Sequence, residues 1–207
     1  MHNKIIIKEI KNNLSDKEFE FLTNLIRKEN PDSLLSSLSQ KMLAKYLNIL
    51  IKSQNIFLYF CEINKTNVGY MIICNSPSFL ISEFKELRLS IFVNLISNLK
   101  LKTLLNIFIS LIKLDIILLF NKRDIINNNP NLSLLAINND YQSKGIGQLF
   151  VEKVINDFEF EKKFNKMTVE TNNSRSEKFF KYKLNFDYLG KKLRLFKNLK
   201  VSLKNLK

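Results

Sequence analysis

Two of the four glycines in the chain, Gly145 and Gly147, lie one residue apart in the stretch YQSKGIGQLF, residues 141–150. They follow an apolar run and precede residues with helical spacing, so we expect them at the start of a helix. Backbone N–H groups at a helix N-terminus have no partners within the helix, and the helix dipole makes this end positive. Because glycine leaves room for close approach, this turn could hold a phosphate or diphosphate, with Lys144 adding a positive charge. A tight strand-to-helix turn without a ligand is the alternative interpretation.

The residues around the glycine pair resemble a known acyl-donor signature. The segment AINNDYQSKGIG, residues 136–147, contains neither the P-loop pattern nor the third glycine of a dinucleotide-binding fingerprint. It resembles the acetyl-CoA signature of the GNAT family of N-acetyltransferases. In that signature an apolar strand leads into Gln or Arg, two variable residues, Gly, an apolar residue, and Gly or Ala. Gln142, Gly145 and Gly147 occupy these positions in order.

A second stretch, NSRSEKFF at 173–180 followed by LNF at 184–186, resembles the second motif of the same family. That motif has Asn, a small residue three positions on, an aromatic pair and a final Leu-Gly-Phe. Here it is one residue longer than usual, and Asn185 replaces the glycine. The resemblance is specific within residues 132–186 and covers the element order over most of the chain, but residues 78–128 lie outside it.

The resemblance implies acetyl-CoA as the acyl-donor substrate. The turn from Gln142 to Gly147 would wrap the CoA diphosphate with backbone amides. Residues 135–137 would pair with the pantetheine arm as if it were another strand, and Asn173 would hydrogen-bond that arm. The expected CoA-binding residues are Leu135, Ala136, Ile137, Gln142, Ser143, Lys144, Gly145, Ile146, Gly147, Gln148 and Asn173.

The catalytic acid and base are marked less clearly. The tyrosine that often protonates the leaving thiolate in this family aligns with Phe180, which leaves Tyr182 or a water as the expected general acid. An ordinary packing role is the alternative for Tyr182. The carboxylate often found at the start of the central strand is here Asn131, our second expected catalytic residue. A base that acts through water would suffice for a site without histidine.

Histidine and cysteine usage excludes several kinds of site. The single histidine, His2, is next to the N-terminus, so we expect no Ser-His or Cys-His pair and no metal site. We expect residues 55–62 and 67–75 to pair as a hairpin. This hairpin would place Cys61 opposite Tyr70 and Cys74 opposite Phe57, so the two sulfurs would not meet. Since MHNKIIIKEIKNN lacks the apolar core of a signal peptide, we expect a reduced, cytoplasmic protein.

The formal net charge of +14 would by itself favour nucleic acid or an anionic membrane as partner. However, Lys, Asn, Ile and Phe are abundant together, which indicates a compositional bias, and no aromatic-basic motif accompanies the charge. We therefore expect no nucleic-acid partner. A length of 207 residues with 45% hydrophobic residues suits one domain, 1–207, with a sizeable core.

The elements that must position these residues follow from hydrophobic periodicity and turn signals. In chain order we expect a strand at 4–10, a helix between Ser15 and Pro31, a second helix over 34–47, a hairpin of 55–62 and 67–75, a helical insertion at 79–126, a strand at 132–138, a helix at 146–158, a strand at 166–171, a helix at 174–184, and terminal strands. This order predicts a mixed α/β domain. The resemblance implies a mixed, mainly antiparallel sheet flanked by helices, with the insertion before the central strand.

Two functions from different classes follow. The first is an N-acetyltransferase that moves acetyl from acetyl-CoA to the primary amine of a small molecule, with an amino sugar of a surface-polysaccharide precursor as the expected acceptor. The alternative is a non-catalytic acyl-CoA-binding or membrane-surface module on the same fold, motivated by the missing tyrosine. The oligomeric state stays open.

The insertion at 79–126 is long for a connection that this family usually makes with a short turn. Its apolar run 104–120 is interrupted by Asn106, Lys113 and Asp115, so we expect no membrane span. Helical spacing predicts amphipathic helices instead. They could cover the core, form a lid over the acceptor site, or rest on an anionic membrane together with the basic tail at 191–207, which would add peripheral membrane association.

Overall fold

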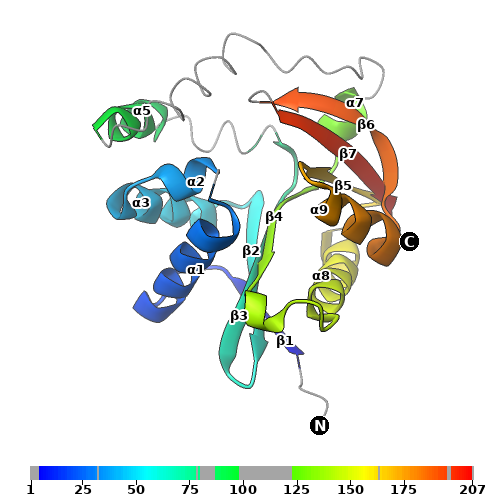
Figure 1. The fold of residues 1–207 in the computed structure, drawn as a ribbon, viewed down its shortest axis with the longest axis horizontal. Helices are drawn as coiled ribbons and strands as arrows, with labels where there is room; N and C mark the ends of the chain where they lie inside the picture. The colour runs from blue at the N-terminus through cyan, green and yellow to red at the C-terminus, as the bar shows by residue number, and fades with distance from the viewer. Residues whose placement is uncertain are drawn as a thin grey trace.

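A seven-stranded sheet runs through the protein (Figure 1), with the strand order β1-β2-β3-β4-β5-β7-β6. The computed structural model describes residues 5–31, 33–77, 79, 87–97, 123–162, 164–194 and 197–206. Every neighbouring pair of these strands is antiparallel except β4 and β5, which are parallel. The predicted fold class, a mixed and mainly antiparallel sheet flanked by helices, is therefore confirmed.

The elements follow the predicted order closely. They are β1 (Ile5–Ile10), α1 (Asp16–Glu29), α2 (Leu34–Ser37), α3 (Gln40–Lys52), β2 (Ile56–Ile63), β3 (Thr66–Cys74), α5 (Arg88–Ser97), α7 (Arg123–Asn127), β4 (Asn131–Ile137), the short 3-10 turn η3 (Asn139–Tyr141), α8 (Ile146–Lys162), β5 (Lys166–Thr171), α9 (Ser174–Lys178), the π-helical turn η4 (Phe179–Lys183), β6 (Asp187–Arg194) and β7 (Lys197–Asn205). Helices α1, α2 and α3 lie on one side of the sheet and α8 on the other (Figure 1).

The two helical layers create two hydrophobic cores, one on each face of the sheet. The core under α1 and α3 contains the fully buried Leu22, Leu43 and Phe60. The core under α8 is built around Phe150 and Phe186. Strands β2 and β3 lie between the two cores and are buried on both faces, which explains why they read as nearly continuous apolar runs.

Serine caps determine where the first helices begin. Ser15 and Glu18 form the predicted capping box at the start of α1. The second predicted helix is wrong as a single element, because it is divided into α2 and α3. The break occurs because Ser39 accepts a hydrogen bond from the backbone N–H of Met42 at 3.3 Å and so caps a new helix. Asn94 of α5 donates to the Ser39 hydroxyl at 2.8 Å and thereby holds α5 against the start of α3.

The β2–β3 hairpin has a different register from the predicted one. Its turn is the two-residue Asn64-Lys65, both with positive φ, and β3 carries a bulge. Cys61 consequently lies opposite Gly69, and Cys74 opposite Ile56, instead of the predicted partners. Both cysteines are free, and burial raises the pKa of each thiol to about 11.

Most of the insertion at 79–126, including the run 104–120, lies outside the described residues. Within the described part, α5 exposes Leu89, Val93 and Ile96, which recur at helical spacing. The basic tail is largely built into the sheet, where β7 pairs with both β5 and β6. Among the helices of the described ranges, none is long and apolar enough to cross a membrane.

Candidate donor-binding cleft

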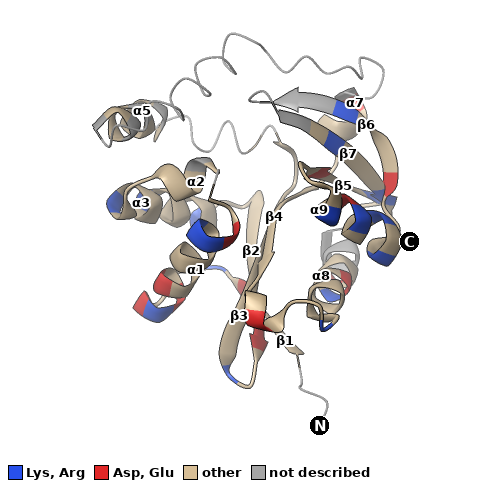
Figure 2. Ribbon diagram, in the orientation of Figure 1, with Lys and Arg blue, Asp and Glu red and all other residues tan. Residues whose placement is uncertain are grey.

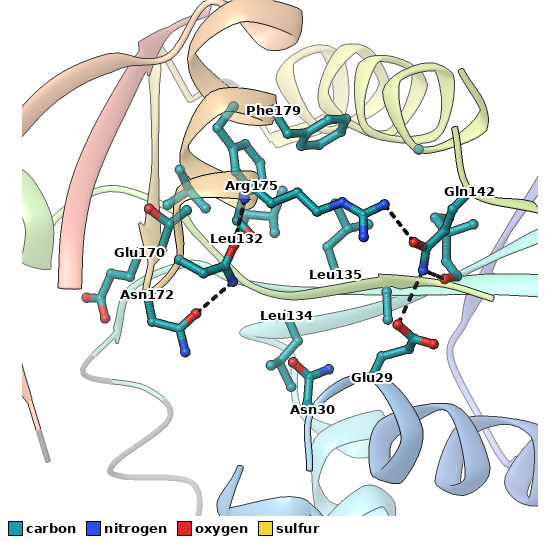
Figure 3. A pocket seen from close by; sticks show the side chains of 18 of the residues that line it. Glu29, Asn30, Leu132, Leu134, Leu135, Gln142, Glu170, Asn172, Arg175 and Phe179 are labelled. Atoms are coloured by element: carbon teal, nitrogen blue, oxygen red, sulfur yellow. Dashed lines mark hydrogen bonds between the residues drawn. The ribbon is translucent and has the colours of Figure 1, made fainter. Parts of the chain in front are cut away.

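Strands β4 and β5 pair only at their beginnings and then separate. Their parallel ladder consists of Asn131 with Thr168 and Leu132 with Val169. Beyond Leu132, a cleft of about 850 Å³ lies between them. Its walls come from the end of α1, from β4, from the turn into α8, and from β5 and α9 (Figure 3).

The separation leaves backbone hydrogen-bonding groups of β4 facing the cleft. Asn138 donates its backbone N–H to the Val68 carbonyl at 2.8 Å, so residues 136 and 134, two and four positions before it, also direct their backbone groups at β3. Leu135 and Ile137 therefore point theirs the other way, into the cleft. The Ile137 carbonyl is taken by the Gln142 side chain at 2.7 Å, which is consistent with this direction. Leu135 lines the cleft with an edge that an extended ligand could pair with.

A β-bulge lies at the closed end of the cleft. Ile72 pairs with Leu134 and Ile73 with Leu132, so the backbone of Ser133 is left out of the pairing with β3. Ser133 lines the cleft. Bulges of this kind redirect backbone groups and bend the strand, which contributes to the separation of β4 from β5.

The turn from β4 into α8 has the backbone of an anion cradle. Ser143 and Gly145 have φ values of 60° and 75°, whereas Lys144 between them has a negative φ. Successive N–H groups in such alternating conformations point to one side and form a nest for anions. The turn leads directly into the 17-residue helix α8, whose positive end adds to the same field.

The two glycines of this turn have different surroundings. A Cβ atom added to Gly145 would meet no atom within 4 Å, so a side chain there would project into open space. At Gly147 an added Cβ would lie 3.6 Å from the side chain of Ile137 and 3.7 Å from that of Phe179, which is ordinary contact. The positive φ is thus what requires glycine at 145, whereas the helical position 147 accommodates alanine.

Gln142 connects the two walls of the cleft. Its Oε1 accepts a hydrogen bond from Arg175 Nη2 of α9 at 2.8 Å, and its Nε2 donates to Glu29 Oε2 at the end of α1 at 3.2 Å. The Arg175 side chain therefore reaches across the cleft toward the cradle (Figure 3). Sequence reasoning did not find Arg175 or Glu29, because the chain separates them from Gln142 by 33 and 113 positions.

The wall formed by α9 follows the second motif. Asn173 caps α9 by accepting from the Ser176 backbone N–H at 2.8 Å. The turn η4 is π-helical, and a π turn accommodates one residue more than an α-helix, which accounts for the extra residue of the motif. Phe180 is buried and lines the cleft, whereas Tyr182 is 67% exposed.

The structure brings together most of the expected CoA-binding residues but neither expected catalytic side chain. Those that line the cleft are Leu135, Ala136, Ile137, Gln142, Ser143, Gly145, Gly147, Gln148 and Asn173. Lys144 donates to the Asp140 carbonyl at 2.7 Å, and Ile146 packs in the core under α8. Neither Tyr182 nor Asn131 is among the lining residues. The Asn131 amide is buried and bonded to the hydroxyls of Thr168 and Ser133, each at 3.1 Å.

Both basic and acidic residues line the cleft. Lys and Arg gather on α9 and the turn after it (Figure 2), and of these Arg175 and Lys183 line the cleft. The acidic lining residues are Glu29 of α1 and Glu170 of β5. Within the described ranges, no group of three His, Cys, Asp or Glu side chains could hold a metal ion.

Comparisons with known proteins find similarity in structure alone. No family model and no curated protein sequence matches the chain. An acetyltransferase from Thermus thermophilus is 13% identical, with a TM-score of 0.59 and 100% of both chains covered. A mutant agmatine N-acetyltransferase in its apo form is 9% identical, with a TM-score of 0.63, covering 98% of this chain and 100% of its own.

A third structure comes from Desulfovibrio desulfuricans and is described as a GNAT-family acetyltransferase. It is 9% identical, with a TM-score of 0.59, and the match covers 98% of this chain and 99% of the other. All three similarities extend over nearly the whole of both chains. At these identities they establish a common fold.

Proposed function

Since the chain has the fold of the GNAT acetyltransferases, we propose that residues 1–207 form a single acyltransferase domain that moves acetyl from acetyl-CoA to a primary amine. The observation that carries the proposal is the cradle at the start of α8, which is continuous with the open edge of β4. The cradle suits a diphosphate, and the open edge of β4 suits an extended arm that contains amides.

The proposed donor lies along β4. Its diphosphate accepts hydrogen bonds from the backbone of 143–147, and its pantetheine arm pairs with Leu135 and runs toward the closed end of the cleft. From Ile137 to Leu132 there are five residue steps of ~3.3 Å, so this edge is about 16 Å long. The thioester would then lie beside the bulge, where the backbone of Ser133 is left out of the pairing with β3 and its N–H would polarise the thioester carbonyl.

The chemistry makes few demands on side chains. A neutral amine attacks the thioester carbonyl carbon, a C–N bond forms, and the C–S bond breaks. The attacking nitrogen then gives up a proton, and the departing thiolate accepts one. Because Phe180 cannot donate a proton and Tyr182 is largely exposed, we propose that water supplies the proton to the thiolate.

The acceptor is proposed as a small molecule with a primary amine. The expectation of an amino sugar rested on the insertion at 79–126, most of which lies outside the described residues, so no contact supports it. Agmatine, the acceptor named for one structure of similar fold, is a different kind of amine. Contact of the insertion and the basic tail with a membrane stays a prediction.

Turnover decides between the enzyme and the non-catalytic module. The chain is incubated with acetyl-CoA and a panel of primary amines that includes agmatine and glucosamine. Free CoA thiol and acetylated amine are then measured by a thiol reagent and by mass spectrometry. We expect both products in equal amounts. Tight binding of acetyl-CoA without thiol release for any amine would favour the non-catalytic acyl-CoA-binding module.

We expect an Arg175→Ala variant to bind acetyl-CoA on the order of tenfold more weakly. The guanidinium of Arg175 bonds to a neutral amide within reach of the cradle, so it is available to a phosphate. The same variant should bind acetyl-pantetheine, which lacks the diphosphate, as well as the original chain does. Calorimetry with both donors makes the measurement.

Lys178→Ala provides the matched control, because Lys178 belongs to the same helix and is exposed outside the cleft lining. It removes the same charge and should leave both affinities unchanged. An Arg175→Ala variant that loses affinity equally for acetyl-CoA and acetyl-pantetheine would show that Arg175 does not act on the phosphates.

A further inference from the structure

The carboxylate of Glu29 is incompletely satisfied. Glu29 is the last residue of α1, and its side chain lines the cleft. Oε2 accepts a hydrogen bond from Gln142 Nε2 at 3.2 Å. Oε1 is buried and accepts none from any residue that the structure describes. A buried carboxylate oxygen without a donor costs free energy, and a bound donor or cation would recover it.

The groups around Glu29 increase the preference for a cation. The C-terminal end of the 14-residue helix α1 carries partial negative charge. Asn30 donates its side-chain N–H to the Tyr70 hydroxyl at 3.2 Å, so this donor is engaged elsewhere. Burial raises the pKa of Tyr70, which keeps its phenol neutral. The guanidinium of Arg175 bonds to Oε1 of the same Gln142 and not to Glu29, so Glu29 Oε1 has no paired cation among the residues that the structure describes.

The position of Glu29 along the cleft separates it from the reacting atoms. Gln142 Nε2 bridges Glu29 and the Ile137 carbonyl, so Glu29 lies at the cradle end of β4. The proposed thioester position is at the opposite end of this strand, on the order of 15 Å away. The amine that attacks the thioester must be neutral, whereas a carboxylate such as Glu29 stabilises a protonated amine. Glu29 thus suits a second amino group of the same acceptor.

We infer that Glu29 binds a distal ammonium group and that the acceptor is an extended diamine or polyamine. The inference rests on the acetyltransferase function proposed above and specifies its substrate class. One amino group reaches the thioester beside Ser133, while another pairs with Glu29 Oε1. The alternative is that Glu29 only holds Gln142 in place. In that case its removal would affect the donor and leave the choice of acceptor unchanged.

The test measures how strongly the protein prefers an acceptor with a second positive charge over one without it. Butane, hexane and octane α,ω-diamines are each paired with the amino alcohol of the same length, which has the reacting amine but lacks the second charge. Glucosamine is added as an amino sugar. Values of kcat/KM are measured for the original chain and for Glu29→Gln, which keeps the side-chain size and an oxygen for Gln142. Glu20→Gln removes an exposed carboxylate from the same helix and is the matched control.

We expect the original chain and Glu20→Gln to prefer a diamine to its amino alcohol by about tenfold or more, with the preference largest for a long diamine. In Glu29→Gln the preference should fall to about one, while the Kd of acetyl-CoA stays unchanged. A preference that persists in Glu29→Gln, equal use of diamine and amino alcohol by the original chain, or preferred use of glucosamine would each overturn the inference. An absence of thiol release with every amine would instead contradict the acetyltransferase proposal itself.

Discussion

A Gly145→Val variant should lose affinity for acetyl-CoA on the order of a hundredfold or more, about 2.7 kcal/mol in binding free energy. Gly145 has a φ of 75°, and a Cβ atom added there projects into open space at the cradle. A branched side chain would fill the volume proposed for the diphosphate and shield the N–H groups that are to bind it. The left-handed backbone costs a non-glycine residue roughly 1–2 kcal/mol, so some stability should be lost as well.

Two measurements separate loss of binding from loss of fold. Calorimetric titration gives the affinity, and thermal unfolding followed by circular dichroism shows that the variant is folded at the titration temperature. Gly147→Ala serves as the control, because an added Cβ there makes only ordinary contacts. That control should bind acetyl-CoA normally. If folded Gly145→Val binds acetyl-CoA with the affinity of the original chain, the cradle is not the phosphate site.

Replacing Phe180 by tyrosine is expected to raise kcat by about tenfold or more. Phe180 lines the cleft and packs edge to face against Phe179 and Phe186. A phenol at this position, with a pKa near ~10, would supply the general acid that we propose water now provides. Stopped-flow detection of the released thiol measures the change.

Tyr182→Phe is the companion variant, because it removes a phenol that is largely exposed. We expect it to retain the rate of the original chain, which would leave Tyr182 without a catalytic role. A strong decrease in kcat for Tyr182→Phe, with unchanged acetyl-CoA affinity, would restore it as the general acid. An unchanged kcat in Phe180→Tyr would mean that protonation of the thiolate does not limit turnover.

Local signals in the sequence were enough to predict most elements of the fold. The capping box at Ser15 and Glu18 acts within four residues, and the run of β-branched isoleucines in β1 is equally local. The errors arose where one or two residues decide the geometry. Ser39 divides a helix that hydrophobic spacing made continuous, and the two-residue turn at Asn64 changes the register of the hairpin.

The residues of the candidate site likewise include some that the sequence predicts and others that it does not. The Gly145–Gly147 pair is a short motif whose backbone requirement can be recognised in the sequence. By contrast, Arg175 and Glu29 both hydrogen-bond to Gln142 only because α1 and α9 lie on opposite sides of the cleft between β4 and β5. The outward direction of Tyr182 depends on the π turn η4, and the extra residue of the second motif is the sequence signal that could have indicated this turn.

The four glycines of the chain permit one direct test of the central claim, that backbone amides at the start of α8 bind acetyl-CoA. Isotope-labelled glycine gives an amide correlation spectrum with one signal for each of Gly69, Gly145, Gly147 and Gly190, and the Gly147→Ala variant assigns one of them. On titration with acetyl-CoA, we predict large shifts for Gly145 and Gly147 and none for Gly190, which lies outside the cleft lining. If acetyl-CoA binds while the signals of Gly145 and Gly147 remain in place, the claim is contradicted.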